Sequence, residues 1–170
     1  MTPEPAGPLS RPVSVERLPP EGAEETITAT PAECAALADD FGLPAIQALS
    51  ARYRLTGTPQ RVRVAGRVTA SITQICVVTL DPFDSTLEED VEVDFAAPGY
   101  AGEGFPVHEG SEPPDEIVNG RIDLGALTAE FLALGLDPYP RKPGVAFDEA
   151  AAPDRSDSPF AALGRLKRDG

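Results

Sequence analysis

The chain has 170 residues, with 14 basic and 28 acidic side chains and a net charge of −14. This charge opposes indiscriminate binding to nucleic acid or to an anionic membrane surface, because such binding needs cations that replace counterions. No stretch reaches the roughly 18 apolar residues of a membrane span, so we expect a cytoplasmic protein with no membrane partner. Cys34 and Cys76 are too few for a disulfide framework, and both are expected to be small buried side chains.

The expected organisation is a single α+β domain over residues 11–142. Residues 1–10 contain several prolines and no hydrophobic periodicity, which predicts a disordered N-terminal segment. Residues 96–118 are rich in Gly, Pro and Glu, which predicts a mobile loop. Residues 143–170 predict a linker and a short amphipathic C-terminal tail.

The first third of the chain predicts two short strands and a helix. Residues 13–18 and 26–30 carry the alternating and β-branched side chains of strands, with a turn at residues 19–22 between them. Thr30, Pro31 and Glu33 then form the pattern of a capping box with proline at the first helical position. We expect a helix that begins there and ends at Gly42.

The middle of the chain predicts an antiparallel meander. Residues 45–55, 61–80 and 87–95 alternate apolar and polar side chains, as half-buried strands do. The turns that join them are expected at Gly57 and near Phe83, and Gly66 is the expected bulge in the long central strand.

A second helix is expected after Asp123, which is a suitable N-cap. Its apolar side chains recur at helical spacing, and Gly135 and Pro138 mark its end. The expected inward stripe is Leu124, Leu127, Phe131 and Leu134. The predicted fold is α+β: a curved antiparallel sheet or partial barrel with a long central hairpin, covered by two helices.

Charge is segregated along the chain. Residues 41–80 contain five arginines and no acid, whereas residues 81–123 contain thirteen acids and one arginine. A second hairpin that turns near Phe83 would set residues 88–94 beside residues 71–77, with Asp94 beside Ser71. The arginines would then gather at one end of the central strand and the acids at the other. The candidate RNA or phosphate patch is Arg52, Arg54, Arg61, Arg63 and Arg67. The candidate patch for a basic partner is Glu88, Asp90, Glu92 and Asp94. The alternative is that both sets only solvate the polar face.

Three segments, in order, resemble the YceD family of large ribosomal RNA subunit accumulation proteins. They are GRVTASITQICVVTLDPF at residues 66–83, Gly120–Leu124 with the following helix and Asp137–Pro140, and Ser158–Ala161 with Leu163 and Leu166–Lys167. The resemblance covers most of the chain beyond residue 11. Many members carry Cys-x-x-Cys at the central hairpin, whereas this chain has Cys76 and Thr79. With His108 as its one histidine, no zinc or other metal site is expected.

The resemblance implies a ribosome biogenesis factor that supports 23S rRNA accumulation and large ribosomal subunit assembly. Its expected partners are large-subunit rRNA, basic ribosomal proteins, or both. No small-molecule substrate is expected. The alternative is an acidic adaptor for a basic ribosomal protein or RNA-processing enzyme, without direct RNA contact. A metal-dependent nuclease using the acids of residues 88–94 is more remote, because their alternation is typical of a solvated strand face. No nucleophile with its base and no phosphate-binding loop is recognised, so no catalytic residue and no cofactor is expected.

Overall fold

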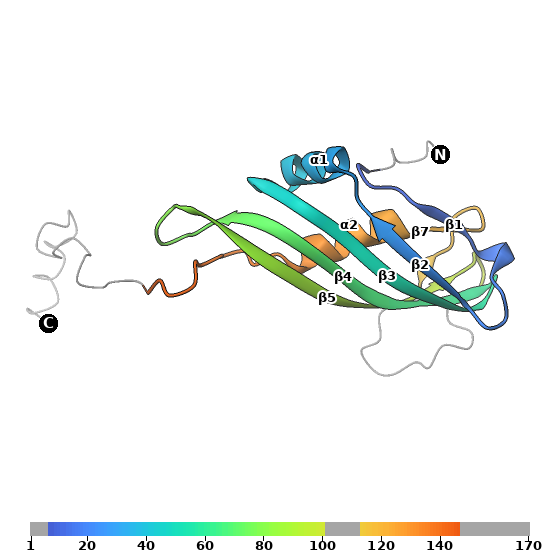
Figure 1. The fold of residues 1–170 in the computed structure, drawn as a ribbon. Helices are drawn as coiled ribbons and strands as arrows, with labels where there is room; N and C mark the ends of the chain where they lie inside the picture. Colours follow the sequence, from blue (N-terminus) through green and yellow to red (C-terminus); the bar gives the residue numbers. More distant parts are fainter. Residues whose placement is uncertain (1–6, 101–112, 147–170) are drawn as a thin grey trace, which may run out of the picture.

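The computed structural model describes residues 7–100 and 113–146 and contains two sheets and two α-helices (Figure 1). The larger sheet has the strand order β2-β3-β4-β5-β6, and every pair is antiparallel except β5 with β6. Its strands are β2 (Ala23–Thr28), β3 (Ala45–Thr58), β4 (Arg61–Ile75), β5 (Pro82–Ala96) and β6 (Asp115–Glu116). The smaller sheet pairs β1 (Pro12–Ser14) with β7 (Arg121–Asp123). The predicted α+β class is confirmed, and the curved sheet stays open, with β2 and β6 at its edges.

The core lies on one face of the large sheet, which we call the inner face. Alternate residues of β3, β4 and β5 point to it, because successive side chains of a strand project to opposite faces. Helix α2 packs against β4 and β5 from behind in the view of Figure 1, and α1 packs against β3. The buried residues on the inner face include Leu49, Tyr53, Leu55, Val62, Val64, Val68, Ile72, Leu87 and Val91.

Helix α1 (Pro31–Phe41) begins as the sequence predicts. The Thr30 hydroxyl accepts from Glu33 N, and the Glu33 carboxylate accepts from Thr30 N at 2.8 Å, which completes the capping box. Arg11 also binds this carboxylate, at 2.8 Å, and thereby holds the N-terminal segment against the helix. The Arg11 hydrogen bond and the Thr30 amide lower the pKa of Glu33 to about 2. Gly42 closes the helix in the left-handed conformation.

Helix α2 (Leu124–Gly135) has the predicted N-cap, since Asp123 accepts from the backbone N–H groups of Gly125 and Ala126. The predicted stripe is wrong at its end, because Leu134 is 70% exposed and Leu132 is fully buried instead. The helix turns its Leu124, Leu127, Thr128 and Leu132 side toward the sheet.

The hairpin between β4 and β5 turns earlier than the sequence predicts. Strand β4 ends at Ile75, and Cys76–Asp81 form the turn, in which Leu80 N donates to the Cys76 carbonyl. Leu80 adopts a φ of +61°, which strand geometry does not allow. The expected strand over residues 61–80 is therefore too long, and β5 starts at Pro82 rather than at Leu87.

The expected bulge at Gly66 is also wrong. Gly66 pairs in regular register with Tyr53 and Val91, and the irregularity lies in β3 between Ile46 and Ala48. A Cβ atom at position 66 would lie 2.0 Å from the Arg52 carbonyl oxygen. Glycine is thus needed for close approach of the strands rather than for a bulge.

The ends of the described region modify the expected boundaries. Leu9, in the segment for which the sequence predicts disorder, is 1% exposed in the core, and Ile117 in the expected mobile loop is buried. Most of that loop, His108 and the expected amphipathic tail lie outside the described residues. Of the helices that the structure describes, none is long and apolar enough to cross a membrane.

Candidate functional site: the charged outer face of the sheet

The five candidate arginines lie on the solvent-facing side of the large sheet, which we call the outer face. Arg52 and Arg54 lie on β3, and the other three lie on β4. Arg52 pairs directly opposite Arg67, and Arg54 opposite Ala65, so the arginines occupy adjacent rows of the sheet. The expectation that they share one face therefore agrees with the strand register.

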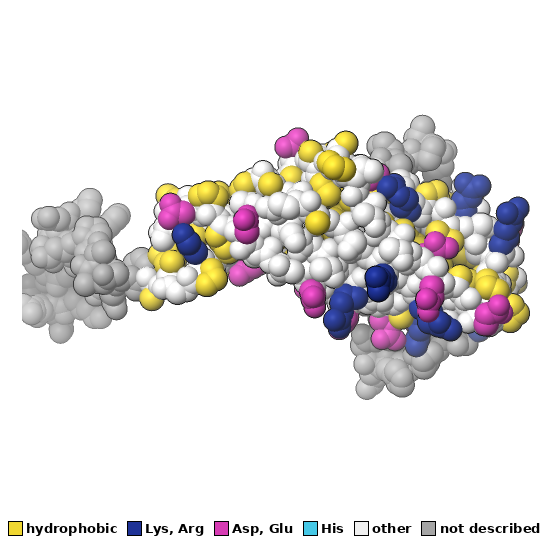
Figure 2. Space-filling model, in the orientation of Figure 1, with side chains coloured by type: hydrophobic (Ala, Val, Ile, Leu, Met, Phe, Trp, Pro, Cys, Tyr) yellow, Lys and Arg dark blue, Asp and Glu magenta, His cyan; other side chains and the backbone are white. Residues whose placement is uncertain are grey.

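The acids of β5 lie among these arginines and not at the far end of the central strand. In the observed register Asp94 pairs with Arg63 and Asp90 with Arg67, whereas the turn expected near Phe83 would place these two acids beside residues 71–75. The expected separation of a basic end from an acidic end is therefore wrong. Figure 2 shows basic and acidic side chains interspersed over the half of the molecule where β2, β3 and β4 meet.

Several of these neighbours form ion pairs. Arg63 binds Asp94 through two parallel hydrogen bonds of 2.7 and 2.9 Å, with Glu92 at 3.4 Å. Arg67 donates from Nε to Asp90 at 2.8 Å. The hydrogen bonds that Arg63 and Arg67 donate to the Asp94 and Asp90 carboxylates raise the pKa of both guanidinium groups. Each exposed pair contributes only ~0–1 kcal/mol to folding, so the main effect of the pairing is on what the face offers to a ligand.

Strand β2, which pairs with β3 on the side away from β4, supplies one further acid. Arg54 binds Glu24 at 3.1 Å and also donates to the Glu21 carbonyl oxygen. Arg52 is exposed and makes no ion pair with any described residue. The outer face thus combines arginines that are largely neutralised with the carboxylates that neutralise them.

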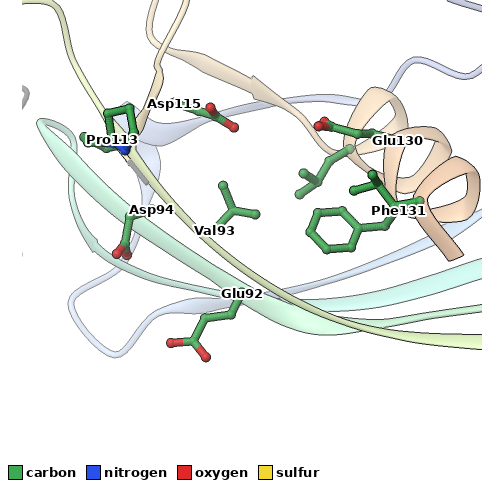
Figure 3. Close-up of a pocket in the computed structure, with 10 residues that line it drawn as sticks. Glu92, Val93, Asp94, Pro113, Asp115, Glu130 and Phe131 are labelled. Carbon is green, nitrogen blue, oxygen red and sulfur yellow. The ribbon is translucent and has the colours of Figure 1, made fainter. Parts of the chain in front are cut away.

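A hollow of about 440 Å³ lies where β5, α2 and the start of β6 meet (Figure 3). Val93 and the Phe131 ring point toward its interior, and Asp115 and Glu130 lie at its upper rim. Glu92 and Asp94 point away from it, to the other side of β5. This arrangement separates the outer-face acids from the inner-face hollow along the same strand.

The β4–β5 hairpin brings together two segments that are distant in sequence. Val77 N donates to the Pro140 carbonyl at 2.9 Å, and Lys142 N donates to the Cys76 sulfur at 3.4 Å. The Lys142 and Thr79 amides lower the pKa of Cys76 to about 7, while its burial opposes this shift. Sequence reasoning missed this contact, although the two segments carry the family signatures. The exposed apolar side chains around it are Ile75, Val77, Leu80 and Tyr139.

The described residues contain no cluster of side chains that could hold a metal ion. Within 7–100 and 113–146, no three His, Cys, Asp or Glu side chains lie together as a metal site would require. Position 79, where a second cysteine would complete Cys-x-x-Cys, carries Thr79, whose hydroxyl oxygen accepts a hydrogen bond from Asp81 N at 3.4 Å. The charged outer face is suited to binding through charge.

An α+β protein with a charged sheet face is the class that this geometry defines. A sequence model of the family described as large ribosomal RNA subunit accumulation protein YceD matches residues 64–167, from β4 past the end of α2. The match spans more than half of the chain, which therefore belongs to this family. The family name connects the chain with ribosome biogenesis in general. No curated protein and no solved structure matches the chain.

Proposed function

We propose that this protein supports the accumulation of 23S rRNA by holding a basic protein of the assembling large ribosomal subunit. It acts in the cytoplasm, where the subunit assembles, and it binds without catalysis. The observation that carries the proposal is the excess of acid, which leaves a net charge of −14 while the outer-face arginines Arg63 and Arg67 are paired. Because Arg63 and Arg67 are already bonded to Asp94 and Asp90, phosphate would have to compete with those carboxylates.

The net charge of −14 supports a basic protein as the main ligand. Basic extensions of ribosomal proteins are attracted to an acidic surface, and complementary charge accelerates their encounter with it. A lysine or arginine of the partner can take the place of the arginine that now binds an outer-face carboxylate. One ion pair is then exchanged for another, so little free energy is lost.

Direct RNA contact through the arginine patch is the second candidate. Arg52 favours it, because this exposed guanidinium has no ion-pair partner in the part of the chain that the structure describes and lies directly opposite Arg67. Guanidinium groups in such a pair are suited to phosphate oxygens. Binding of this kind would be weak and strongly dependent on salt.

A direct binding experiment separates the two candidates. The immobilised full chain is incubated separately with large-subunit proteins freed of RNA and with large-subunit RNA freed of protein. The proposal predicts retention of basic proteins and weak retention of RNA at physiological salt. Strong RNA retention that is lost on Arg52→Gln, with no protein retained, would replace the proposal by the RNA candidate.

A further inference from the structure

Strand β5 has one long edge that no strand of the described residues covers. β4 pairs with it from Pro82 to Ala96, but on the other side β6 pairs only with Phe95 and Ala96. Among the described residues, the outer edge of β5 from Pro82 to Asp94 therefore has no strand partner. Unpaired main-chain groups on such an edge are a template for another extended chain.

The backbone groups that face the open edge follow from two hydrogen bonds. Ala97 N donates to the Gln60 carbonyl on the β4 side, and Ile117 N donates to the Ala96 carbonyl on the opposite side. Consecutive strand residues direct their N–H and C=O groups to alternate sides, and the β4–β5 register is unbroken. The even-numbered residues from Asp84 to Glu92 thus present donors and acceptors to the open edge.

A groove of about 490 Å³ runs along part of this edge. One wall is a continuous run of β5, residues 83–89, and the other is the segment that follows α2. The backbone bond from Val77 to Pro140 and the bond from Lys142 to the Cys76 sulfur hold this segment in place. The groove therefore lies between two segments of the chain, which suits an extended peptide.

The charge of the groove indicates what enters it. Its lining residues include Asp84 and Glu88, whose carboxylates lie on the outer face beside Thr73 and Arg67, and also Glu89, Asp137 and one basic residue, Arg141. An apolar floor lies between them, formed by Ile72, Phe83 and Leu87. A second copy of this chain does not fit, because antiparallel pairing of two β5 edges would place carboxylates opposite carboxylates.

We propose that the open edge of β5 accepts an extended basic segment of a partner protein as an added strand. Main-chain hydrogen bonds provide the affinity, apolar side chains of the segment reach the floor of the groove, and its lysines or arginines meet the β5 carboxylates. The inference deepens the proposed function and rests on it, since it assigns the basic partner to this edge.

The test uses a fluorescent peptide of alternating arginine and valine, about six residues long, as the length of a strand requires. Its affinity for the full chain is compared with that of the same peptide N-methylated on alternate residues, which keeps the charge but removes strand donors. A peptide of alternating glutamate and valine controls for charge. We expect the arginine peptide to bind and N-methylation to weaken it about tenfold or more, with no binding of the glutamate peptide.

Amide hydrogen exchange locates the contact. The Thr86 and Glu88 amides should exchange more slowly when the arginine peptide is added, whereas the Leu87 amide, which faces β4, should change little. Thr86→Pro removes one edge donor and should weaken binding about tenfold, while Thr86→Val should bind as the unaltered chain does. If Thr86→Pro fails to fold, the comparison of the N-methylated peptide with the unmodified arginine peptide tests strand addition by itself.

Equal binding of the N-methylated peptide, or no slowing at residues 86 and 88, would overturn strand addition. Retention of basic large-subunit proteins would still stand in that case, so the two proposals fail separately. A chain that is dimeric and becomes monomeric as Thr86→Pro, without binding the peptide, would assign the edge to a second copy instead.

Discussion

The inner and outer faces of the large sheet are built from alternate residues of the same strands, yet their side chains depend on different information. On the inner face an apolar side chain can pack against any apolar neighbour. The alternation of apolar and polar residues in β3 and β4 is therefore enough to define the core. On the outer face, Arg54, Arg63 and Arg67 each bind a particular acid on a neighbouring strand. The two faces show that alternation decides which side a residue faces, whereas register decides which residue it meets.

The largest expected effect is on the inner face, where two leucines of one helix differ in burial. Leu132→Ala should lower the free energy of unfolding by ~2–5 kcal/mol, because it empties a fully buried site. Leu134→Ala, at a site that is 70% exposed, should change it by less than ~0.5 kcal/mol. Urea unfolding of both variants measures the difference, and equal effects would contradict the observed orientation of α2.

Gly66→Ala tests the close approach of β3 and β4. The added methyl group would meet the Arg52 carbonyl oxygen at 2.0 Å and the Tyr53 ring at 2.8 Å, so the strands must separate. We expect a loss of ~1–3 kcal/mol in stability by thermal or urea unfolding. Gly7→Ala is the control, because nothing lies within 4 Å of its added Cβ. An unchanged Gly66→Ala variant would show that the strands are not so close.

The outer face should be much less sensitive in stability. A double-mutant cycle with Arg63→Gln and Asp94→Asn should give a coupling of ~0–1 kcal/mol that shrinks at high salt, since the Arg63 side chain is 42% exposed. The same cycle with Arg63→Gln and Thr86→Val, which do not pair, is the control. A coupling of several kcal/mol would mean that the pair is a structural element of the fold.

The two cysteines should titrate differently. Burial raises the pKa of Cys34, whereas amide hydrogen bonds lower that of Cys76 to about 7. The stability that the Cys76 thiolate contributes is present above its unfolded pKa of about 9 and is lost as the pH falls through 7. Thiolate absorbance should therefore appear near pH 7 in Cys34→Ala and only above pH 9 in Cys76→Ala. Identical curves would refute the bonding at Cys76.

The successes and errors of the sequence predictions follow from the same distinction. The cap at Thr30, the stop at Gly42 and the N-cap at Asp123 are local, and all three are confirmed. The turn after β4 could not be predicted from local sequence, because Val77, Val78 and Leu80 are residues typical of a strand. The Leu80 conformation and the contact with Pro140 depend on packing that is remote in sequence.

That single turn accounts for the error in the candidate site. The sequence places Asp94 beside Ser71, and the structure places it beside Arg63, eight positions away on β4. Because eight is even, each residue keeps its face and changes only its neighbour. The face of the candidate residues was therefore predictable, but the pairing that neutralises the arginines was not.

The most direct test of the account compares two variants that break the same ion pairs with opposite changes in charge. The acid-depleted variant carries Asp90→Asn and Asp94→Asn. The arginine-depleted variant carries Arg63→Gln and Arg67→Gln. Each variant removes the ion pairs Arg63–Asp94 and Arg67–Asp90. Mature large-subunit RNA is then measured in a deletion strain that carries either variant. We predict that the acid-depleted variant fails to restore this RNA and the arginine-depleted variant restores it. The reverse result would contradict the account and assign the outer face to RNA.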